Sequence, residues 1–190
     1  MAAQYAHLKH IVKPKFELGI LIEGTDLFNS RATNKFTDSG NYKVNILEKN
    51  IVQIYPISLY ISGRLIIIGN LSFEFRPGII FAGEPYSGFE YGFFLRYKML
   101  NKKIILIGGV NLHDNIGAGH NSLVSTGETI TEIGGSVGYQ FTKSFAGIVS
   151  YYKPSKEIEY YSEYSNDYID EYTYKLKYII KFGFDFTFNW

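Results

Sequence analysis

The chain has no cysteine among its 190 residues, only five prolines and a single tryptophan. The lack of cysteine excludes a disulfide scaffold, a thiolate metal site and a cysteine nucleophile together. No stretch approaches the roughly 18 consecutive apolar residues that a transmembrane helix requires. With 19 basic against 18 acidic residues, the charge balance gives no electrostatic signature of nucleic-acid binding. A membrane-spanning form of this chain must therefore use β-strands.

Tyrosine and phenylalanine are abundant, at 17 and 15 residues, and the C-terminal segment arranges them with a period of two. From Tyr174 to Trp190 nearly every second residue is apolar, and most residues between these are polar or glycine. Such a period indicates a β-strand whose two faces meet different surroundings. A long aromatic stripe is poorly suited to a soluble core, so we expect it to face lipid.

Seven further segments upstream have strand-like patterns, which predicts eight strands in all. The expected ranges are 15–25, a segment within 44–61, 65–82, 89–99, 104–113, 129–141, 145–152 and the terminal stripe. Tight turns are expected at Ser62-Gly63-Arg64, Asn101-Lys102 and Thr142-Lys143-Ser144. Pro56 and Pro77 should each mark a rim or a bulge, because proline cannot donate a hydrogen bond to a ladder.

The predicted connections alternate in length. Those after the second, fourth and sixth strands are short, those after the first, fifth and seventh are long, and the link at 83–87 is a short exception. Short turns at one end and long loops at the other are typical of bacterial outer-membrane barrels, whose turns lie in the periplasm. Because eight is an even number, both ends of such a chain fall on the side of the turns.

From Lys15 to Trp190 the chain resembles the small eight-stranded outer-membrane barrels of the OmpA/OmpX type and, more loosely, OmpW-like barrels. Two elements carry the resemblance. One is a stripe similar to the C-terminal aromatic signal read by the barrel assembly machinery, namely Phe182, Phe184, Phe186, Phe188 and Trp190. The other is the strand-turn-strand segment 138–144. Segment 181–188 also resembles the mitochondrial barrel sorting pattern, but eight strands and a terminal aromatic residue favour a bacterial barrel.

The resemblance implies an all-β fold, a closed antiparallel up-and-down transmembrane β-barrel of eight strands. We expect one domain over 1–190, with 1–14 as a periplasmic N-terminal segment and 15–190 as the barrel in a bacterial outer membrane. The start of the sequence has no visible signal peptide, so we expect a mature sequence with a new initiator methionine. A soluble barrel with the stripe turned inward is the structural alternative.

Charged residues occupy the minor faces of the predicted strands, and we expect them inside the barrel. They are Glu17, Glu23, Glu74, Glu90, Glu132 and Asp185 against Arg76, Arg96, Lys98, Lys177 and Lys181. A bore of eight strands is only wide enough for side chains, and confined charges must pair or lose several kcal/mol each to desolvation. The sequence therefore predicts a plug of ion pairs, with a proton or ion path as the alternative.

A hydrolase is a further hypothesis, because some barrels of this type deacylate lipid A with a His-x-Ser pair. His120 and Ser122 resemble that pair, and Glu128 or Glu132 could orient the histidine. The pair falls in a Gly/Asn/Ser-rich segment that reads as a loop, so an incidental histidine is the favoured interpretation. His113 is expected at the rim. No histidine has metal-ligand spacing with carboxylate support, and we expect no metal and no cofactor.

The last predicted loop, 151–174, contains eight tyrosines interleaved with acidic residues. Tyrosine supplies contact area at low entropic cost, so contact candidates are Tyr160, Tyr161, Tyr164 and Tyr168; alternatively these residues pair across extended strands. The expected role is structural or surface interaction, with outer-membrane lipids, lipopolysaccharide, the assembly machinery and an extracellular or envelope protein as partners. Lateral passage of small hydrophobic molecules is the other alternative, requiring an apolar pocket and a wall gap near Pro77-Gly78.

Overall fold

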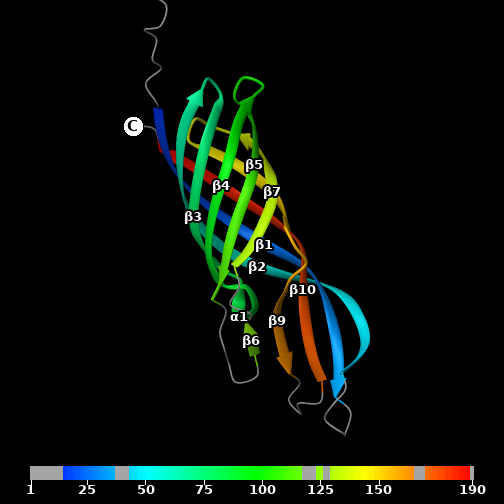
Figure 1. Cartoon of the computed structure of the whole chain (residues 1–190). Helices are drawn as coiled ribbons and strands as arrows, with labels where there is room; N and C mark the ends of the chain where they lie inside the picture. Colours follow the sequence, from blue (N-terminus) through cyan, green and yellow to red (C-terminus); the bar gives the residue numbers. More distant parts are fainter. Residues whose placement is uncertain (1–14, 37–42, 117–122, 126–128, 165–169, 189–190) are drawn as a thin grey trace, which may run out of the picture.

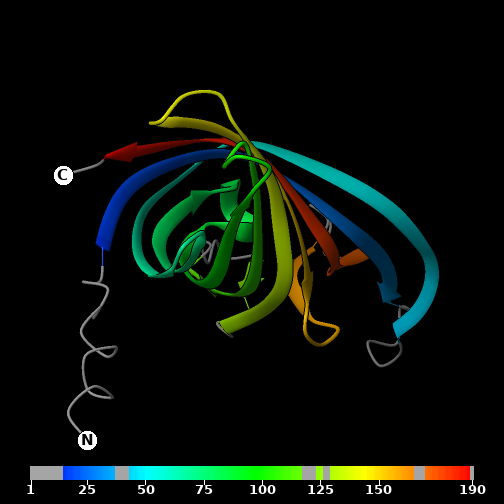
Figure 2. The same ribbon diagram turned by 90° about the horizontal axis from the view of Figure 1, so that it is seen from above.

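The computed structural model describes residues 15–36, 43–116, 123–125, 129–164 and 170–188. Its strands form one antiparallel sheet in the order β1-β2-β3-β4-β5-β7-β8-β10, and β10 pairs with β1 to close it. The bounds are β1 Lys15–Phe36, β2 Lys43–Ile68, β3 Leu71–Phe81, β4 Gly88–Met99, β5 Ile104–Asn115, β7 Thr129–Gln140, β8 Phe145–Pro154 and β10 Asp170–Phe188. The predicted closed up-and-down barrel of eight strands is confirmed (Figures 1 and 2).

Three wall strands are much longer than the other five, and two of them, β1 and β2, are also much longer than expected. β1 has 22 residues, β2 has 26 and β10 has 19, against 10 to 12 in β3, β4, β5, β7 and β8. About 9–11 tilted residues suffice to cross a bilayer. β1, β2 and β10 therefore run on past the shorter strands at one end of the barrel (Figure 1). Residues 26–36, which the sequence placed in the long connection after the first strand, belong to β1.

The predicted turn at Ser62-Gly63-Arg64 is wrong. These residues lie inside β2 and pair with β1 from Ser62↔Gly19 to Arg64↔Glu17. The chain instead reverses at Gly69 and Asn70, where Gly69 has a positive φ of 52°. A left-handed φ favours glycine, whereas Gly63 is an ordinary strand residue. The other two predicted turns are confirmed, and Leu100, Asn101 and Lys102 all have positive φ.

The three short turns lie together at one end of the barrel, and the described ends of the chain lie with them. Leu18 pairs with Phe188, and the amide of Thr187 donates to the carbonyl of Ser144 in the β7–β8 turn at 2.9 Å. We call this the turn end. The opposite end carries the strand extensions and two further strands, β6 Leu123–Ser125 and β9 Glu159–Tyr164, and we call it the outer end.

A β-bulge in β10 exchanges the two faces of this strand. Phe28 of β1 pairs with Tyr178 and Asn29 pairs with Leu176, so Lys177 is the extra residue. Between the bulge and the turn end, odd-numbered residues such as Lys181 and Asp185 are buried. Beyond it, the even-numbered Leu176 and Tyr174 are buried and Lys177 is exposed. The predicted uniform stripe from Tyr174 therefore holds only from Tyr178 to Phe188.

The two prolines behave differently. At Pro56 the register between β2 and β1 shifts, from Ser58↔Glu23 to Tyr55↔Thr25. Residues 56 and 57 therefore oppose the single residue 24, which is the predicted bulge. Pro77 lies in the middle of β3, and the β2–β3 register is the same on both sides of it, so its predicted rim or bulge is wrong. No β2 partner is recorded for Pro77 itself, and the missing donor is accommodated by this interruption of the ladder.

Burial is inverted relative to a soluble protein. Along β4, outward residues such as Phe93 and Leu95 are 42% and 55% exposed, whereas the charged Glu90 and Arg96 on its inward face are 0% exposed. The other short strands repeat this alternation, and aromatic neighbours such as Phe75 and Phe93 contact each other on the outer surface with ring centres 5.1 Å apart. Among the described residues, no helix has the length and hydropathy needed to cross a membrane.

Candidate functional site

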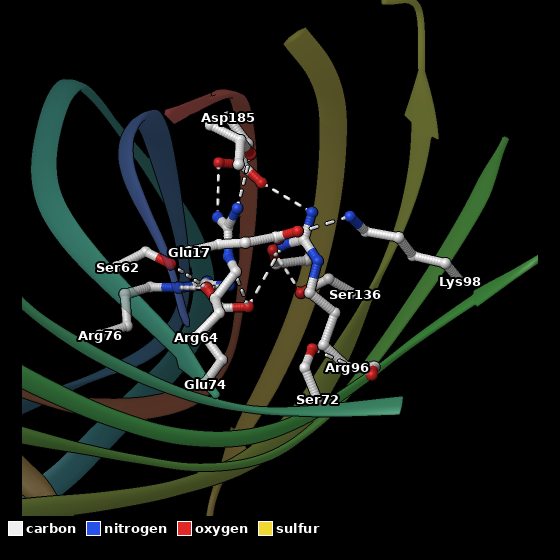
Figure 3. A network of polar contacts seen from close by, with 12 residues as sticks. Glu17, Ser62, Arg64, Ser72, Glu74, Arg76, Arg96, Lys98, Ser136 and Asp185 are labelled. Carbon is white, nitrogen blue, oxygen red and sulfur yellow. Dashed lines mark hydrogen bonds and ion pairs between the residues drawn. The ribbon is translucent and has the colours of Figure 1, made fainter. Parts of the chain in front are cut away.

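The half of the interior nearest the turn end is filled by interlocked charges. Asp185 accepts from Arg64 Nη2 at 2.6 Å and from Arg96 Nη2 at 2.8 Å. Glu74 accepts from Arg76 Nη2 at 2.9 Å and from Arg96 Nη1 at 3.2 Å, and it lies 3.6 Å from Arg64 Nε. Figure 3 shows these side chains converging from β2, β3, β4 and β10. Each carboxylate is thus shared by two or three guanidinium groups, and we call this set the arginine layer.

Serine, threonine and a peripheral ion pair complete the arginine layer. Ser62 donates to Glu74 at 2.9 Å, and Arg64 Nη1 donates to Thr187 at 2.6 Å. Towards the turn end, Lys98 Nζ lies 3.6 Å from Glu17. Buried charges cost several kcal/mol each unless their remaining donors and acceptors find partners. The shared geometry meets that condition for the carboxylates and for the terminal guanidinium nitrogens named here, whereas Arg64 Nε and Arg96 Nε have no hydrogen-bond partner among the described residues. The contacts link strands that are distant around the wall.

A second layer lies nearer the middle of the barrel. Glu90 accepts from Lys181 Nζ at 2.6 Å and from the Tyr60 hydroxyl at 2.6 Å. The other Glu90 oxygen lies 3.4 Å from His113 Nδ1. Ser150 donates to Glu23 at 3.3 Å. We call this set the Glu90 layer. Its contacts around Glu90 link β2, β4, β5 and β10, and the Ser150–Glu23 hydrogen bond links β8 to β1.

The short link after β3 closes the interior above the Glu90 layer. Its residues form the one-turn helix α1 Gly83–Tyr86, which lies within the barrel outline when viewed along the axis (Figure 2). The ring of Tyr86 stacks on His113 with centres 3.9 Å apart, and its hydroxyl donates to Glu132. Tyr160 of β9 packs edge-on against Tyr86 at 5.6 Å. Side chains therefore occupy the described interior at three successive levels, namely the arginine layer, the Glu90 layer and α1.

The predicted interior charges divide into three groups. Nine of the eleven are buried: Glu17, Glu23, Glu74, Arg76, Glu90, Arg96, Glu132, Lys181 and Asp185. Lys98 is half-buried at the turn end. Lys177 is on the outside, where its Nζ donates to Asn50 at 2.8 Å, because the bulge exchanges the faces of β10. Arg64, fully buried in the arginine layer, was missed because its segment was taken as a turn.

The tyrosines proposed as contacts are not a common outer surface. Tyr160 is 0% exposed and Tyr161 is 6% exposed, and the hydroxyl of Tyr160 donates to Gln53 at 3.2 Å. Tyr161 contacts Tyr174 across the β9–β10 pair with ring centres 5.4 Å apart, as the alternative of paired extended strands predicts. The side chain of Tyr164 and all of Tyr168 lie outside the described residues.

The hydrolase residues His120, Ser122 and Glu128 lie outside the described residues. Glu132 is described, and it is buried in the wall with hydrogen bonds from Tyr86 and, at 2.9 Å, from Asn111. His113, expected at the rim, is instead 0% exposed in the interior. The hydrolase hypothesis therefore stays a prediction that rests on the sequence alone.

The terminal aromatic stripe faces outward as expected. Phe182, Phe184, Phe186 and Phe188 are 53%, 53%, 38% and 47% exposed, and Phe145 of β8 contacts both Phe184 and Phe186. Trp190 lies outside the described residues. Recognition of this stripe by an assembly machinery stays a prediction.

The wall beside Pro77 and Gly78 does not open onto an apolar pocket. Tyr60, on the neighbouring strand, is buried there, and its Cδ1 would lie 2.1 Å from a Cβ added at Gly78. Arg76 lies over the ring of Phe94 at 4.7 Å on the inner side. Among the described residues at this position, the inner surface is therefore occupied by aromatic and charged groups.

No protein-family model matches the chain, and no curated protein matches it. Among solved structures, the outer membrane protein OprG from Pseudomonas aeruginosa is 9% identical with a TM-score of 0.48, covering 93% of this chain and 98% of its own. The N-terminal β-barrel domain of Pseudomonas aeruginosa OprF is 11% identical with a TM-score of 0.46, and the match covers 93% of this chain and 100% of that domain. The outer membrane protein AlkL, solved in lipid bilayers, is 10% identical with a TM-score of 0.49, and the match covers 93% of this chain and 91% of AlkL.

Proposed function

We propose that this protein is an integral β-barrel of a bacterial outer membrane with a structural or surface-interaction role. In this role the barrel wall anchors the chain in lipid, and the strand extensions at the outer end present a surface beyond the membrane. Outer-membrane lipids and lipopolysaccharide would surround the wall. A protein partner in the envelope or outside the cell would contact the outer end.

The inverted burial carries this proposal. Backbone polar groups in hydrocarbon find no water, so a sheet crosses a bilayer only when its ladder is closed. Here β1 and β10 close the ladder over 18 residue pairs, the outward positions are apolar, and the interior holds many charged and polar side chains beside buried apolar ones. A soluble barrel would turn the apolar face inward, so the burial pattern favours lipid over the soluble alternative.

The orientation follows from the unequal ends. Bacterial barrels place short turns in the periplasm and longer elements outside, so the turn end is assigned to the periplasm. Lys15 and Phe188 would then both be periplasmic. The outward stripe from Phe182 to Phe188 would be read there by the barrel assembly machinery during insertion.

A structural role fits the filled interior better than transport does. The arginine layer, the Glu90 layer and α1 follow one another along the axis, and their side chains are bonded across the lumen. An open pore would require at least one continuous water column through these layers. We therefore assign no transport role.

The test is to refold the full chain in detergent and compare its gel migration with and without boiling. A closed barrel resists detergent when unboiled, so we expect two clearly different mobilities, together with recovery of the protein in the membrane fraction after reconstitution into liposomes. The control is the same protein refolded without detergent. Soluble, monodisperse protein in that control would contradict the proposal and support a soluble ligand-binding barrel.

A further inference from the structure

Towards the outer end of the closed barrel, β8 and β10 separate. These strands pair from Phe145↔Phe186 only as far as Tyr152↔Ile179. Beyond that point β10 pairs with β9, beginning at Lys175↔Glu159, and β9 lies beside it at the outer end (Figure 1). A hollow of about 540 Å³ lies at this separation. We call it the lateral hollow.

The lateral hollow lies at the level where the outer surface changes from apolar to basic. Along β8 the outward residues are Val149, then Tyr151, then the exposed Lys153. On β10 the corresponding change falls between Tyr178 and Lys177, and the rings of Tyr151 and Tyr178 are 5.7 Å apart. Aromatic rings at such a boundary lie at the lipid headgroups. The hollow therefore faces headgroups rather than acyl chains.

The lining of the lateral hollow carries excess positive charge. It includes four lysines and one acidic residue, namely Lys153, Lys156, Lys175, Lys177 and Glu157. Lys175 Nζ lies 3.3 Å from both Glu157 and Glu159, and hydrogen bonds to these carboxylates raise the pKa of Lys175, so it stays charged. The recorded partner of Lys177 is the neutral amide of Asn50. Gathered cations repel one another, and an anion placed among them relieves that repulsion.

We propose that the lateral hollow binds a phosphate group of an anionic lipid in the outer leaflet of the membrane. Lysine ammonium groups bind phosphate as compact charges with rotatable donors. The apolar rings of Tyr151 and Tyr178, which also line the hollow, would contact the part of the acyl chains nearest the headgroup. This proposal rests on the proposed function, because only a barrel inserted in the membrane brings the hollow to the headgroups.

The experiment compares binding of three probes to the refolded full chain in neutral detergent by native mass spectrometry. The probes are bisphosphorylated lipid A, the same lipid without phosphates, and inorganic phosphate. The test variant is Lys153→Gln with Lys177→Gln. The matched control is Lys103→Gln with Lys143→Gln, which removes two exposed lysines at the turn end. A boiled-versus-unboiled gel verifies that each variant is folded.

We expect wild type to bind the phosphorylated lipid and to discriminate against the other two probes. Each lysine near an anionic headgroup contributes about fivefold in binding, so the test variant should bind about 25-fold more weakly while the control variant binds as wild type does. Equal losses in both variants, or equal binding of the lipid without phosphates, would overturn the proposal. Inorganic phosphate bound as tightly as the lipid would overturn the lipid as the source. A wild type that shows the gel shift without binding refutes the site alone; one without the shift refutes the barrel as well.

Discussion

Arg64 and Lys177 show how strongly the burial of a charged residue, and its contribution to stability, depend on its neighbours. Arg64 is buried between Asp185 and Glu74, whereas Lys177 is exposed beside Asn50. The sequence alone predicts a turn at Arg64 and an interior position for Lys177. The buried guanidinium neutralises two carboxylates that have been removed from water, so its loss leaves charge uncompensated. The lysine gives up little water and contributes little to folding.

We therefore predict that Arg64→Met destabilises the folded barrel by about 3–5 kcal/mol. The matched control, Lys177→Met, should change the free energy of unfolding by less than about 0.5 kcal/mol. Urea unfolding of the protein in vesicles of zwitterionic lipid, which contain no anionic lipid for Lys177 to bind, measures both when it is followed by the gel shift. A large decrease in the free energy of unfolding of the lysine variant would show that β10 lacks the bulge and that Lys177 faces the interior.

At the scale of elements, the wall depends on where neighbouring strands approach closely. A Cβ added at Gly109 of β5 would lie 2.2 Å from the carbonyl oxygen of Phe93 in β4. At the adjacent Gly108, nothing lies within 4 Å of such a Cβ. Both glycines occupy regular pairs, Gly109 with Phe94 and Gly108 with Leu95. Two neighbouring glycines in one strand thus have unequal roles.

The expected outcome is that Gly109→Ala destabilises the barrel by about 1–3 kcal/mol, because the backbone of β4 must move. Gly108→Ala should be neutral within about 0.5 kcal/mol. The same urea titration in vesicles compares the two variants. Equal stability of both would mean that β4 and β5 are not as close at Gly109 as the structure has them.

The extension at the outer end is also an element with its own core. Tyr160 packs on Tyr86 of α1 and donates to Gln53 of β2. We predict that Tyr160→Ala accelerates amide hydrogen exchange in β9 while leaving the boiled-versus-unboiled gel shift unchanged, because the tyrosine supports the extension rather than the closed wall. Unchanged exchange in β9 would return Tyr160 to the surface role that the sequence suggested.

For the whole molecule, the order in which the side-chain layers are stacked along the barrel axis decides whether a solute can pass through the barrel. The arginine layer, the Glu90 layer and α1 occupy successive levels, and a bore of eight strands leaves room for little beyond side chains. We predict that the wild-type protein in planar lipid bilayers produces no steady ionic conductance. Steady single-channel openings in the wild type would contradict the filled interior and favour the ion path left open by the sequence.

The sequence by itself determined the wall and the chemistry of its two faces. Alternation is a local property, because successive side chains of a strand point to opposite sides, so the outward aromatic residues and most interior charges could be identified without a partner strand. The even strand number and the unequal connections then placed both ends on one side, and the resemblance to small outer-membrane barrels implied closure. Nine of the interior charges, among them Glu74, Glu90 and Asp185, were found in this way.

Only the tertiary structure decided where the alternation fails and what fills the outer half. The bulge at Lys177 arises from pairing with β1 and is not encoded in the spacing of β10. The run of β2 through Ser62 and Arg64 is formed by pairing with β1 and β3, although the spacing of β2 is compatible with it. Continuous alternation through Tyr60, Ser62 and Arg64 was the signal that could have revealed the missing arginine. The inward position of Tyr86 depends on contacts with His113, Glu132 and Tyr160. Residues far apart in the chain meet there only after the barrel closes.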